Sequence, residues 1–135
     1  MKPISELRRD LVTGDWVVIA VGRAKRPHDF ASQKKPPFRQ PKKKCPFEYL
    51  HKEALLAYAF DGKVIPSSWQ VQVIPNKYPA FAQGACAIFE SSGPYEWTQG
   101  VGFHEVVITR DHTRTIADMT DRQVELVIRA YQERY

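Results

Sequence analysis

The chain has 135 residues, of which 43% are hydrophobic and 12% aromatic. This length and composition suffice for one globular domain and exclude a disordered protein. The formal net charge is +5, but six lysines and arginines and three prolines crowd into residues 34–44. Because Phe38 is the only aromatic residue in that run, we do not expect a nucleic-acid-binding protein. The chain has no apolar signal core and no run of roughly 18 apolar residues, so we expect a cytoplasmic protein with no membrane partner.

Residues 4–21 predict a β-hairpin. Thr13-Gly14-Asp15 is a turn signal, and the run at residues 16–20 is β-branched and aromatic, which is typical of a strand buried on both faces or nearly so. Gly22 ends the strand, and three cations follow within four residues: Arg23, Lys25 and Arg26. Arginine can hold phosphate oxygens at two points, so this turn suits a phosphate-bearing small molecule, although solvated surface charges account for it equally well.

The middle of the chain predicts further strands. Residues 53–60 could form a helix or a strand, and the turn signal at 61–63 favours a hairpin that returns through Val64-Ile65. Residues 69–74 alternate between apolar and polar types, which indicates a half-buried strand. Another strand is predicted at 102–109.

The C-terminal segment predicts an amphipathic helix. Thr120 is a suitable N-cap with Gln123 three residues later, and Val124, Val127, Ile128 and Tyr131 recur at helical spacing to form its apolar face. Several strands followed by one helix predict an α+β fold with a mostly antiparallel sheet. The helix runs to the last residue, which we interpret as a sign that the chain is part of a longer protein.

The segment 10–20, followed by Arg23-Ala-Lys-Arg-Pro27, resembles the N-terminal signature of the galactose-1-phosphate uridylyltransferases and the related nucleotide-sugar phosphorylases of the histidine-triad superfamily. The resemblance implies that residues 1–135 are an N-terminal domain with an incomplete histidine-triad-like fold and a flexible basic arm at about 31–44. It also implies an enzyme of galactose metabolism that exchanges UMP between UDP-glucose and a hexose 1-phosphate, and a homodimer of the intact protein.

The same resemblance assigns nucleotide-sugar contacts to three residues. Arg23 and Arg26 correspond to positions that hold the phosphates, and Asn76 corresponds to a residue that contacts the ribose or the base. Lys77 stands where the family often has Asp, so this loop departs from the usual pattern. A purely structural alternative for Asn76 is that its side chain caps the backbone of its own loop.

The resemblance also implies a zinc site. The family usually has Cys-x-x-Cys where this chain has Cys45-Pro-Phe-Glu48, so Glu48 replaces one thiolate ligand. His112, after Asp111, matches the third ligand, and the fourth belongs to a part of the family beyond this chain. Carboxylate oxygens can bind zinc. A histidine at the end of a strand is, however, also a common structural hydrogen-bonding residue.

His104 and Glu105 are adjacent and invite an acid/base interpretation. Consecutive strand residues point to opposite faces, so we expect that the two do not meet and that His104 is structural or lines a pocket. The family's nucleophile is the second histidine of a His-x-His motif, which this chain lacks. We therefore assign no catalytic residue and expect the isolated chain to be inactive.

Two alternatives to the uridylyltransferase remain open. Gly102-Phe-His-Glu105 resembles the phosphorylase branch of the superfamily, which predicts a phosphorylase of ADP-glucose or of a dinucleoside polyphosphate. The other alternative is a non-catalytic module that binds an anionic partner through residues 34–44.

Overall fold

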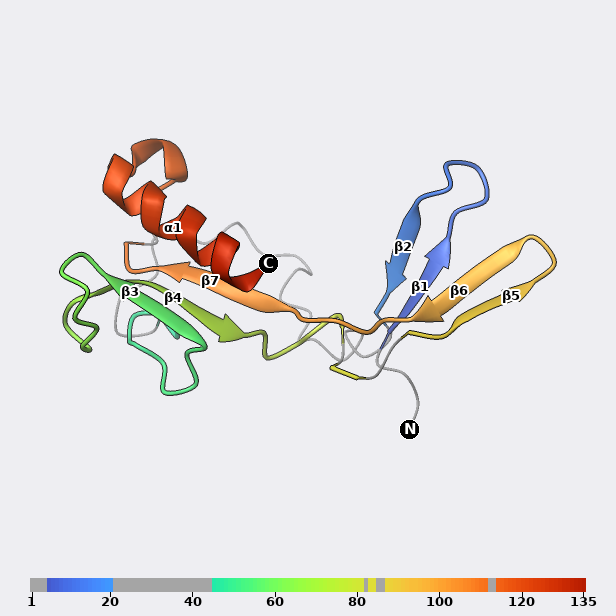
Figure 1. Ribbon diagram of the computed structural model, residues 1–135, viewed down its shortest axis with the longest axis horizontal. Coiled ribbons are helices and arrows are strands. Elements are labelled where there is room, and N and C mark those ends of the chain that lie inside the picture. The colour runs from blue at the N-terminus through green and yellow to red at the C-terminus, as the bar shows by residue number, and fades with distance from the viewer. Residues whose placement is uncertain (1–4, 21–44, 82, 85–86, 112–113) are drawn as a thin grey trace, which may run out of the picture. The chain divides into compact units, whose positions relative to one another are not determined.

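The computed structural model describes residues 5–20, 45–81, 83–84, 87–111 and 114–135. The chain divides into two compact units (Figure 1). Unit 1 contains Met1–Asp29 and Asn76–His104, and unit 2 contains Phe30–Pro75 and Glu105–Tyr135. Each unit has an antiparallel sheet, and unit 2 adds one helix, so the predicted α+β class is confirmed. The basic arm at 31–44 lies outside the described residues.

Unit 1 is a four-stranded antiparallel sheet with the strand order β2-β1-β6-β5. Its strands are β1 (Glu6–Arg9), β2 (Trp16–Ile19), β5 (Phe89–Ser92) and β6 (Tyr95–Gln99). The predicted hairpin is confirmed, because β1 pairs with β2. Its turn is held by the Asp10 carboxylate, which accepts hydrogen bonds from the backbone N–H groups of Val12 and Thr13 at 2.8 and 2.9 Å. Gly14, at φ 77°, provides the left-handed conformation that the turn requires.

The prediction that the second strand of this hairpin is buried on both faces is wrong. Trp16, Val17, Val18 and Ile19 are each between 37% and 50% exposed. The reason is that β2 is an edge strand, and the described part of unit 1 contains no helix to cover the sheet. Trp16 instead makes an edge-to-face contact with Phe89, the two ring centroids being 5.8 Å apart.

Unit 2 is a three-stranded antiparallel sheet with the order β3-β4-β7. Its strands are β3 (Leu56–Ala59), β4 (Trp69–Pro75) and β7 (Glu105–Thr109), so both strands predicted for this region are confirmed, the second with a later start. Residues 53–60 include a strand, but its partner is β4. Val64 and Ile65 lie instead in a loop, which the Ser68 hydroxyl closes by donating to the Lys63 carbonyl at 2.6 Å.

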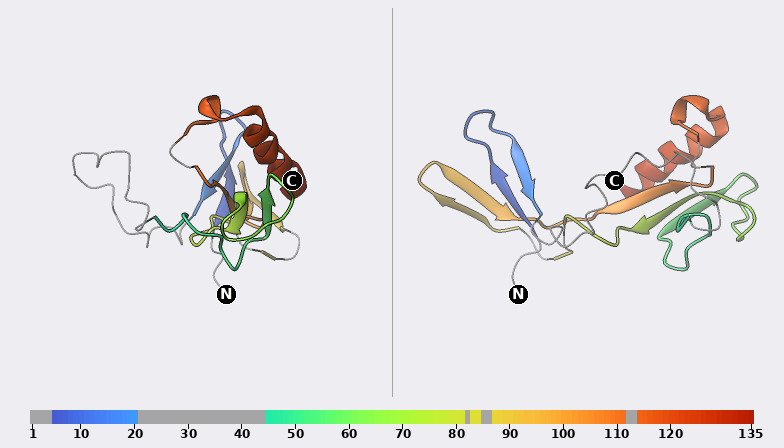
Figure 2. Two further views of the ribbon diagram at one scale, coloured as in Figure 1. Left: turned by 90° about the vertical axis from the view of Figure 1, so that its left-hand side faces the viewer. Right: turned by 180° about the vertical axis from the view of Figure 1, so that it is seen from behind.

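Helix α1 (Asp121–Arg134) covers one face of the unit 2 sheet (Figure 2). It begins after the 3₁₀ turn Ile116–Asp118, and its predicted capping box of Thr120 and Gln123 is confirmed. Within the described part of the chain, no helix is long and apolar enough to cross a membrane.

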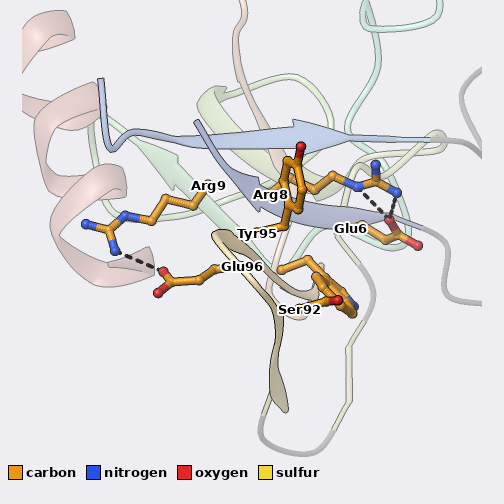
Figure 3. Close-up of a pocket in the computed structure, with 7 residues that line it drawn as sticks. Glu6, Arg8, Arg9, Ser92, Tyr95 and Glu96 are labelled. Carbon is orange, nitrogen blue, oxygen red and sulfur yellow. Dashed lines mark hydrogen bonds and ion pairs between the residues drawn. The ribbon is translucent and has the colours of Figure 1, made fainter. Parts of the chain in front are cut away.

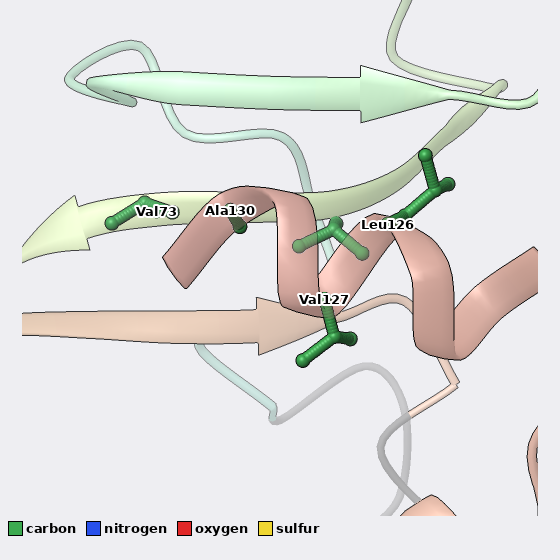
Figure 4. Close-up of a cluster of buried hydrophobic side chains, with 5 residues drawn as sticks. Val73, Leu126, Val127 and Ala130 are labelled. Carbon is green, nitrogen blue, oxygen red and sulfur yellow. The ribbon is translucent and has the colours of Figure 1, made fainter. Parts of the chain in front are cut away.

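The apolar contact between α1 and the sheet differs from the predicted one. Leu126, Val127 and Ala130 are the buried helix residues, and they form a core with Val71 and Val73 of β4 (Figure 4). Of the predicted face, Ile128 and Tyr131 are 49% and 51% exposed. Helical spacing predicted the element correctly, but the packing on β4 selects a face centred on Leu126 and Ala130, which are one turn apart.

Candidate functional site

Two residues that the sequence analysis singled out, Asn76 and His104, lie in contact in the structure. Asn76 directly follows β4 and His104 directly precedes β7. The backbone N–H of Asn76 donates to the carbonyl of His104 at 2.9 Å, and Asn76 Nδ2 lies 3.1 Å from His104 Nε2. Both residues are partly buried. The antiparallel pairing of the chain on either side thus brings together two polar side chains that are 28 residues apart.

These two side chains also organise the loop that begins at Asn76. Tyr78 N–H donates to Asn76 Oδ1 at 2.8 Å, so the predicted capping of the loop by Asn76 is confirmed. The N–H of the buried Ala80 donates to His104 Nδ1 at 2.8 Å. Lys77, between these contacts, is exposed, with its Nζ 5.7 Å from the centroid of the Tyr78 ring. The loop therefore presents the Asn76 amide and the exposed Lys77 cation on neighbouring residues, with the His104 imidazole hydrogen-bonded to the loop.

Glu105 does not meet His104, as predicted. It accepts two hydrogen bonds from the Arg134 guanidinium, at 2.9 and 2.6 Å, which tie β7 to the last turn of α1 within unit 2. These hydrogen bonds lower the pKa of the Glu105 carboxyl below its ordinary value. Glu105 is thus a structural ion-pair partner, and the adjacent histidine and glutamate do not form an acid/base pair.

Cys45 and Glu48, two of the predicted zinc ligands, lie at the two ends of a single turn. The Glu48 N–H donates to the Cys45 carbonyl at 3.4 Å, and both side chains are partly buried. The third predicted ligand, His112, lies outside the described residues. Among the residues that the structure describes, no cluster contains three His, Cys, Asp or Glu side chains. Thiolate sulfur and carboxylate oxygen are both donor types that can bind zinc.

Buried Gln72 holds the loop that carries Cys45 and Glu48. The Gln72 side chain is fully buried on β4, where it donates to the Tyr49 carbonyl and accepts from the His51 N–H, both at 2.9 Å. Since side chains alternate along a strand, Gln72 points away from the face that Val71 and Val73 present to α1. The sequence pattern placed Gln72 on a polar, half-exposed face and therefore missed this role.

The phosphate-binding residues implied by the resemblance, Arg23 and Arg26, lie outside the described residues. Among the predicted site residues, the structure therefore places Asn76 beside His104 and Cys45 in the same turn as Glu48. It gives no position for the two arginines. The pairing of Asn76 with His104 was also not predicted. The sequence did contain a signal for it, because Asn76 follows one predicted strand and His104 lies at the start of another. Predicting that these two strands pair antiparallel would have placed the two residues side by side.

A separate cavity of about 330 Å³ lies in unit 1 (Figure 3). It contains two arginines, but each already faces a carboxylate: Arg8 pairs with Glu6 at 2.8 Å, and Arg9 pairs with Glu96 at 2.9 Å. The pairs neutralise each other's charge, so this cavity offers no excess positive charge to an anion. It contains none of the predicted site residues, and its lining is Glu6, Arg8, Arg9, Ser92, Tyr95, Glu96 and Trp97.

Comparison with known proteins supports the superfamily indicated by the motifs. The chain is 34% identical to the ADP-glucose phosphorylase of Arabidopsis thaliana over an alignment of 135 residues. The alignment covers 96% of this chain but 38% of that enzyme, so the chain spans well under half the length of its relative. No protein-family model and no solved structure matches the chain. The chain is thus similar to part of a nucleotide-sugar phosphorylase.

Proposed function

We propose that this chain is part of an enzyme that transfers a nucleoside monophosphate from a nucleotide sugar, with ADP-glucose as the sugar nucleotide and inorganic phosphate as the acceptor. The observation that carries the proposal is the 34% identity to an ADP-glucose phosphorylase along almost the whole chain. The Gly102-Phe-His-Glu105 sequence, which resembles the phosphorylase branch, supports the same choice.

The second candidate is a UDP-glucose–hexose-1-phosphate uridylyltransferase, because the motif at residues 10–27 resembles these enzymes as well as the related phosphorylases. The two reactions share one chemical step and differ in the base and in the acceptor. In phosphorolysis, AMP moves from ADP-glucose to phosphate, which yields ADP and glucose 1-phosphate. In the uridylyltransferase reaction, UMP moves from UDP-glucose to a hexose 1-phosphate, which yields glucose 1-phosphate and a new UDP-sugar.

Within this function the chain's residues act in binding. Asn76 would contact the ribose or the base of the nucleotide, and Arg23 and Arg26 would neutralise the diphosphate and the charge that develops during transfer. The chain contains no His-x-His motif, so the covalent nucleophile must come from outside these residues. We therefore expect no turnover by the 135-residue chain alone.

Zinc is part of the proposal as a structural ion held by Cys45, Glu48 and His112. It would fix the loop that Gln72 holds on the sheet, rather than take part in the transfer. Purified protein should then contain up to one zinc per chain by mass spectrometry, and Cys45→Ala should remove it. Zinc content unchanged in Cys45→Ala would contradict this assignment.

The decisive experiment compares two acceptors. The coding DNA is read beyond the Tyr135 codon, and the product of the complete frame is assayed beside the 135-residue chain. We expect the complete product to release glucose 1-phosphate from ADP-glucose when phosphate is present, and the 135-residue chain to release none. Turnover only with UDP-glucose and a hexose 1-phosphate would establish the uridylyltransferase instead.

Two other outcomes would contradict the proposal. Turnover by the 135-residue chain alone would show that the nucleophile lies within it. Absence of turnover and of nucleotide-sugar binding in every form would favour an anion-binding module, which should bind generic polyanions with steep salt dependence through residues 34–44.

A further inference from the structure

The hydrogen bonds around His104 define which ring nitrogen carries the proton. The Ala80 backbone N–H, 2.8 Å from Nδ1, can only donate, so Nδ1 must accept. A neutral imidazole has one acceptor nitrogen and one N–H group. The proton of His104 is therefore on Nε2, the atom that lies 3.1 Å from Asn76 Nδ2.

The amide of Asn76 presents a second donor at the same place. Its Oδ1 accepts the Tyr78 N–H at 2.8 Å, which orients its Nδ2 group toward the His104 ring. Rotating the amide by 180° would give Nε2–H an acceptor, but it would set Nδ2 against the Tyr78 N–H. In the observed orientation, His104 Nε2–H and Asn76 Nδ2–H both lack an acceptor among the described residues. In the rotated one, Asn76 Nδ2 and the Tyr78 N–H would face each other as donors. An unmatched donor in a partly buried site is costly, so the cluster favours an external acceptor.

We propose that the Asn76–His104 pair binds one oxygen atom of the nucleotide sugar, which accepts hydrogen bonds from His104 Nε2–H and Asn76 Nδ2–H together. An oxygen placed about 2.9 Å from each nitrogen meets both donors with ordinary hydrogen-bond lengths. A phosphoryl oxygen and a ribose hydroxyl both have this accepting chemistry. The inference rests on the proposed function for the identity of the ligand, and it adds His104 as a ligand-binding residue.

His51 in unit 2 provides an internal control for this argument. Its Nε2 lies 2.9 Å from the Pro46 carbonyl, which can only accept, so the proton on that nitrogen already has a partner. The rings of His51 and His104 should therefore both carry the proton on Nε2. They differ because the Nε2–H of His51 already has an acceptor, whereas that of His104 does not have one among the described residues. Ligand should therefore perturb His104 and leave His51 unchanged.

The test is nuclear magnetic resonance on the isotope-labelled 135-residue chain. Long-range ¹H–¹⁵N spectra report the tautomers of both rings, and the chain is titrated separately with inorganic phosphate, adenosine, ADP and ADP-glucose. We expect the Nε2–H tautomer for His104, with ligand-induced shifts at its ring and at the Asn76 side-chain amide. Shifts with phosphate alone identify a phosphoryl oxygen, and shifts with adenosine alone identify the ribose.

Asn76→Asp is the matching variant, because it keeps the shape of the side chain. In this variant one carboxylate oxygen still accepts from the Tyr78 N–H, and the other accepts from the His104 Nε2–H. The Nε2–H then no longer needs an oxygen atom of the ligand as its acceptor. We expect ADP-glucose to bind about tenfold more weakly, the loss typical of one good hydrogen bond, with no fall in melting temperature. The control His51→Gln should leave the affinity unchanged. If His104 and Asn76 served the loop only, Asn76→Asp would not change ligand affinity.

The failure of this inference and the failure of the proposed function are distinguishable. If ADP-glucose binds without shifts at Asn76 and His104, or if His104 carries its proton on Nδ1, the inference is wrong and the proposed function stands. If phosphate or adenosine shifts the pair but ADP-glucose binds neither this chain nor the complete product, the site stands and the proposed function is wrong. If none of the four ligands binds the 135-residue chain, the inference is wrong, and the assay of the complete product decides the proposed function.

Discussion

The apolar strand residues of the two sheets differ in their solvent exposure. In unit 2, Val71 and Val73 are 2% and 0% exposed, because α1 lies over them. In unit 1, Val17 and Phe89 are 50% and 72% exposed on a sheet with no described helix over it. Similar strand composition therefore leads to burial in one unit and exposure in the other. The covering element, and not the strand, decides where the core forms.

One buried side chain of unit 2 and one residue pair of unit 1 differ in how their polar groups are satisfied. In unit 2, buried Gln72 has partners at both ends of its amide. In unit 1, the Asn76–His104 pair directs two donors at each other. A fully satisfied network stabilises a fold, whereas an unmatched one favours ligand binding. We therefore expect Gln72 to contribute to the stability of unit 2, and the Asn76–His104 pair to contribute to ligand recognition.

The largest expected effect tests the core of unit 2. Leu126→Ala should lower the free energy of unfolding by about 2–4 kcal/mol, because it leaves a cavity between α1 and β4. Ile128→Ala on the same helix is the control, and it should cost less than about 0.5 kcal/mol, since Ile128 is half exposed. Urea unfolding followed by circular dichroism measures both. Equal losses would mean that the helix packs through the face predicted from its spacing alone.

A smaller effect is expected at Gly100, whose backbone lies close to Ser5 in unit 1. A Cβ atom on Gly100 would lie 1.9 Å from Ser5 Oγ, and Ser5 is buried. Gly100→Ala should therefore cost about 1–3 kcal/mol through overpacking. Gly84→Ala is the control, because the nearest described side chain that its Cβ would meet is Val101, at 3.9 Å. Thermal unfolding of the two variants should differ clearly, and similar melting temperatures would contradict the close packing of Ser5 on Gly100.

The ion pair of unit 2 should contribute less. Glu105→Gln is expected to cost about 0.5–1 kcal/mol, because Glu105 and Arg134 form two hydrogen bonds but water still screens the pair. The pKa of Glu105 is lowered in the folded state, so this contribution is present above the ordinary pKa of a glutamate and is lost as the pH falls through the lowered value.

Unfolding measured from neutral to acidic pH tests this sign. The difference between wild type and Glu105→Gln should shrink as the pH falls below about 4. Glu125→Gln, on the exposed side of α1, serves as the control and should leave stability nearly unchanged at every pH. A difference that grows on acidification would contradict the ion pair.

The smallest effect is expected at the exposed ion pair of unit 1. The side chains of Arg9 and Glu96 are 49% and 44% exposed, so Glu96→Gln should change stability by no more than about 0.5 kcal/mol. The same variant removes a negative charge from the cavity of Figure 3. Thermal unfolding at low and high salt measures the change, and a loss above 1 kcal/mol would show that unit 1 depends on this pair more than unit 2 depends on Glu105 and Arg134.

Local sequence signals predicted the secondary-structure elements better than they predicted the burial and the pairing of those elements. The turn at 13–15, the alternation at 69–74 and the Thr120 capping box each depend on neighbouring residues, and each was predicted correctly. Strand β6 was not predicted, because Tyr95–Gln99 lacks a clear apolar alternation and owes its structure to pairing with β1 and β5. The apolar composition of β2 predicted burial, which its edge position prevents.

The sequence by itself determined the α+β class, the order of most elements and the separation of His104 from Glu105, and it offered the capping of the loop by Asn76 as one of two alternatives. These follow from turn chemistry and side-chain periodicity, which act over a few residues. Only the tertiary structure decided that β3 pairs with β4, that Leu126 faces the sheet, and that Asn76 meets His104. These contacts join residues far apart in the chain, and which of them form depends on the competition between surfaces for burial and for hydrogen-bond partners.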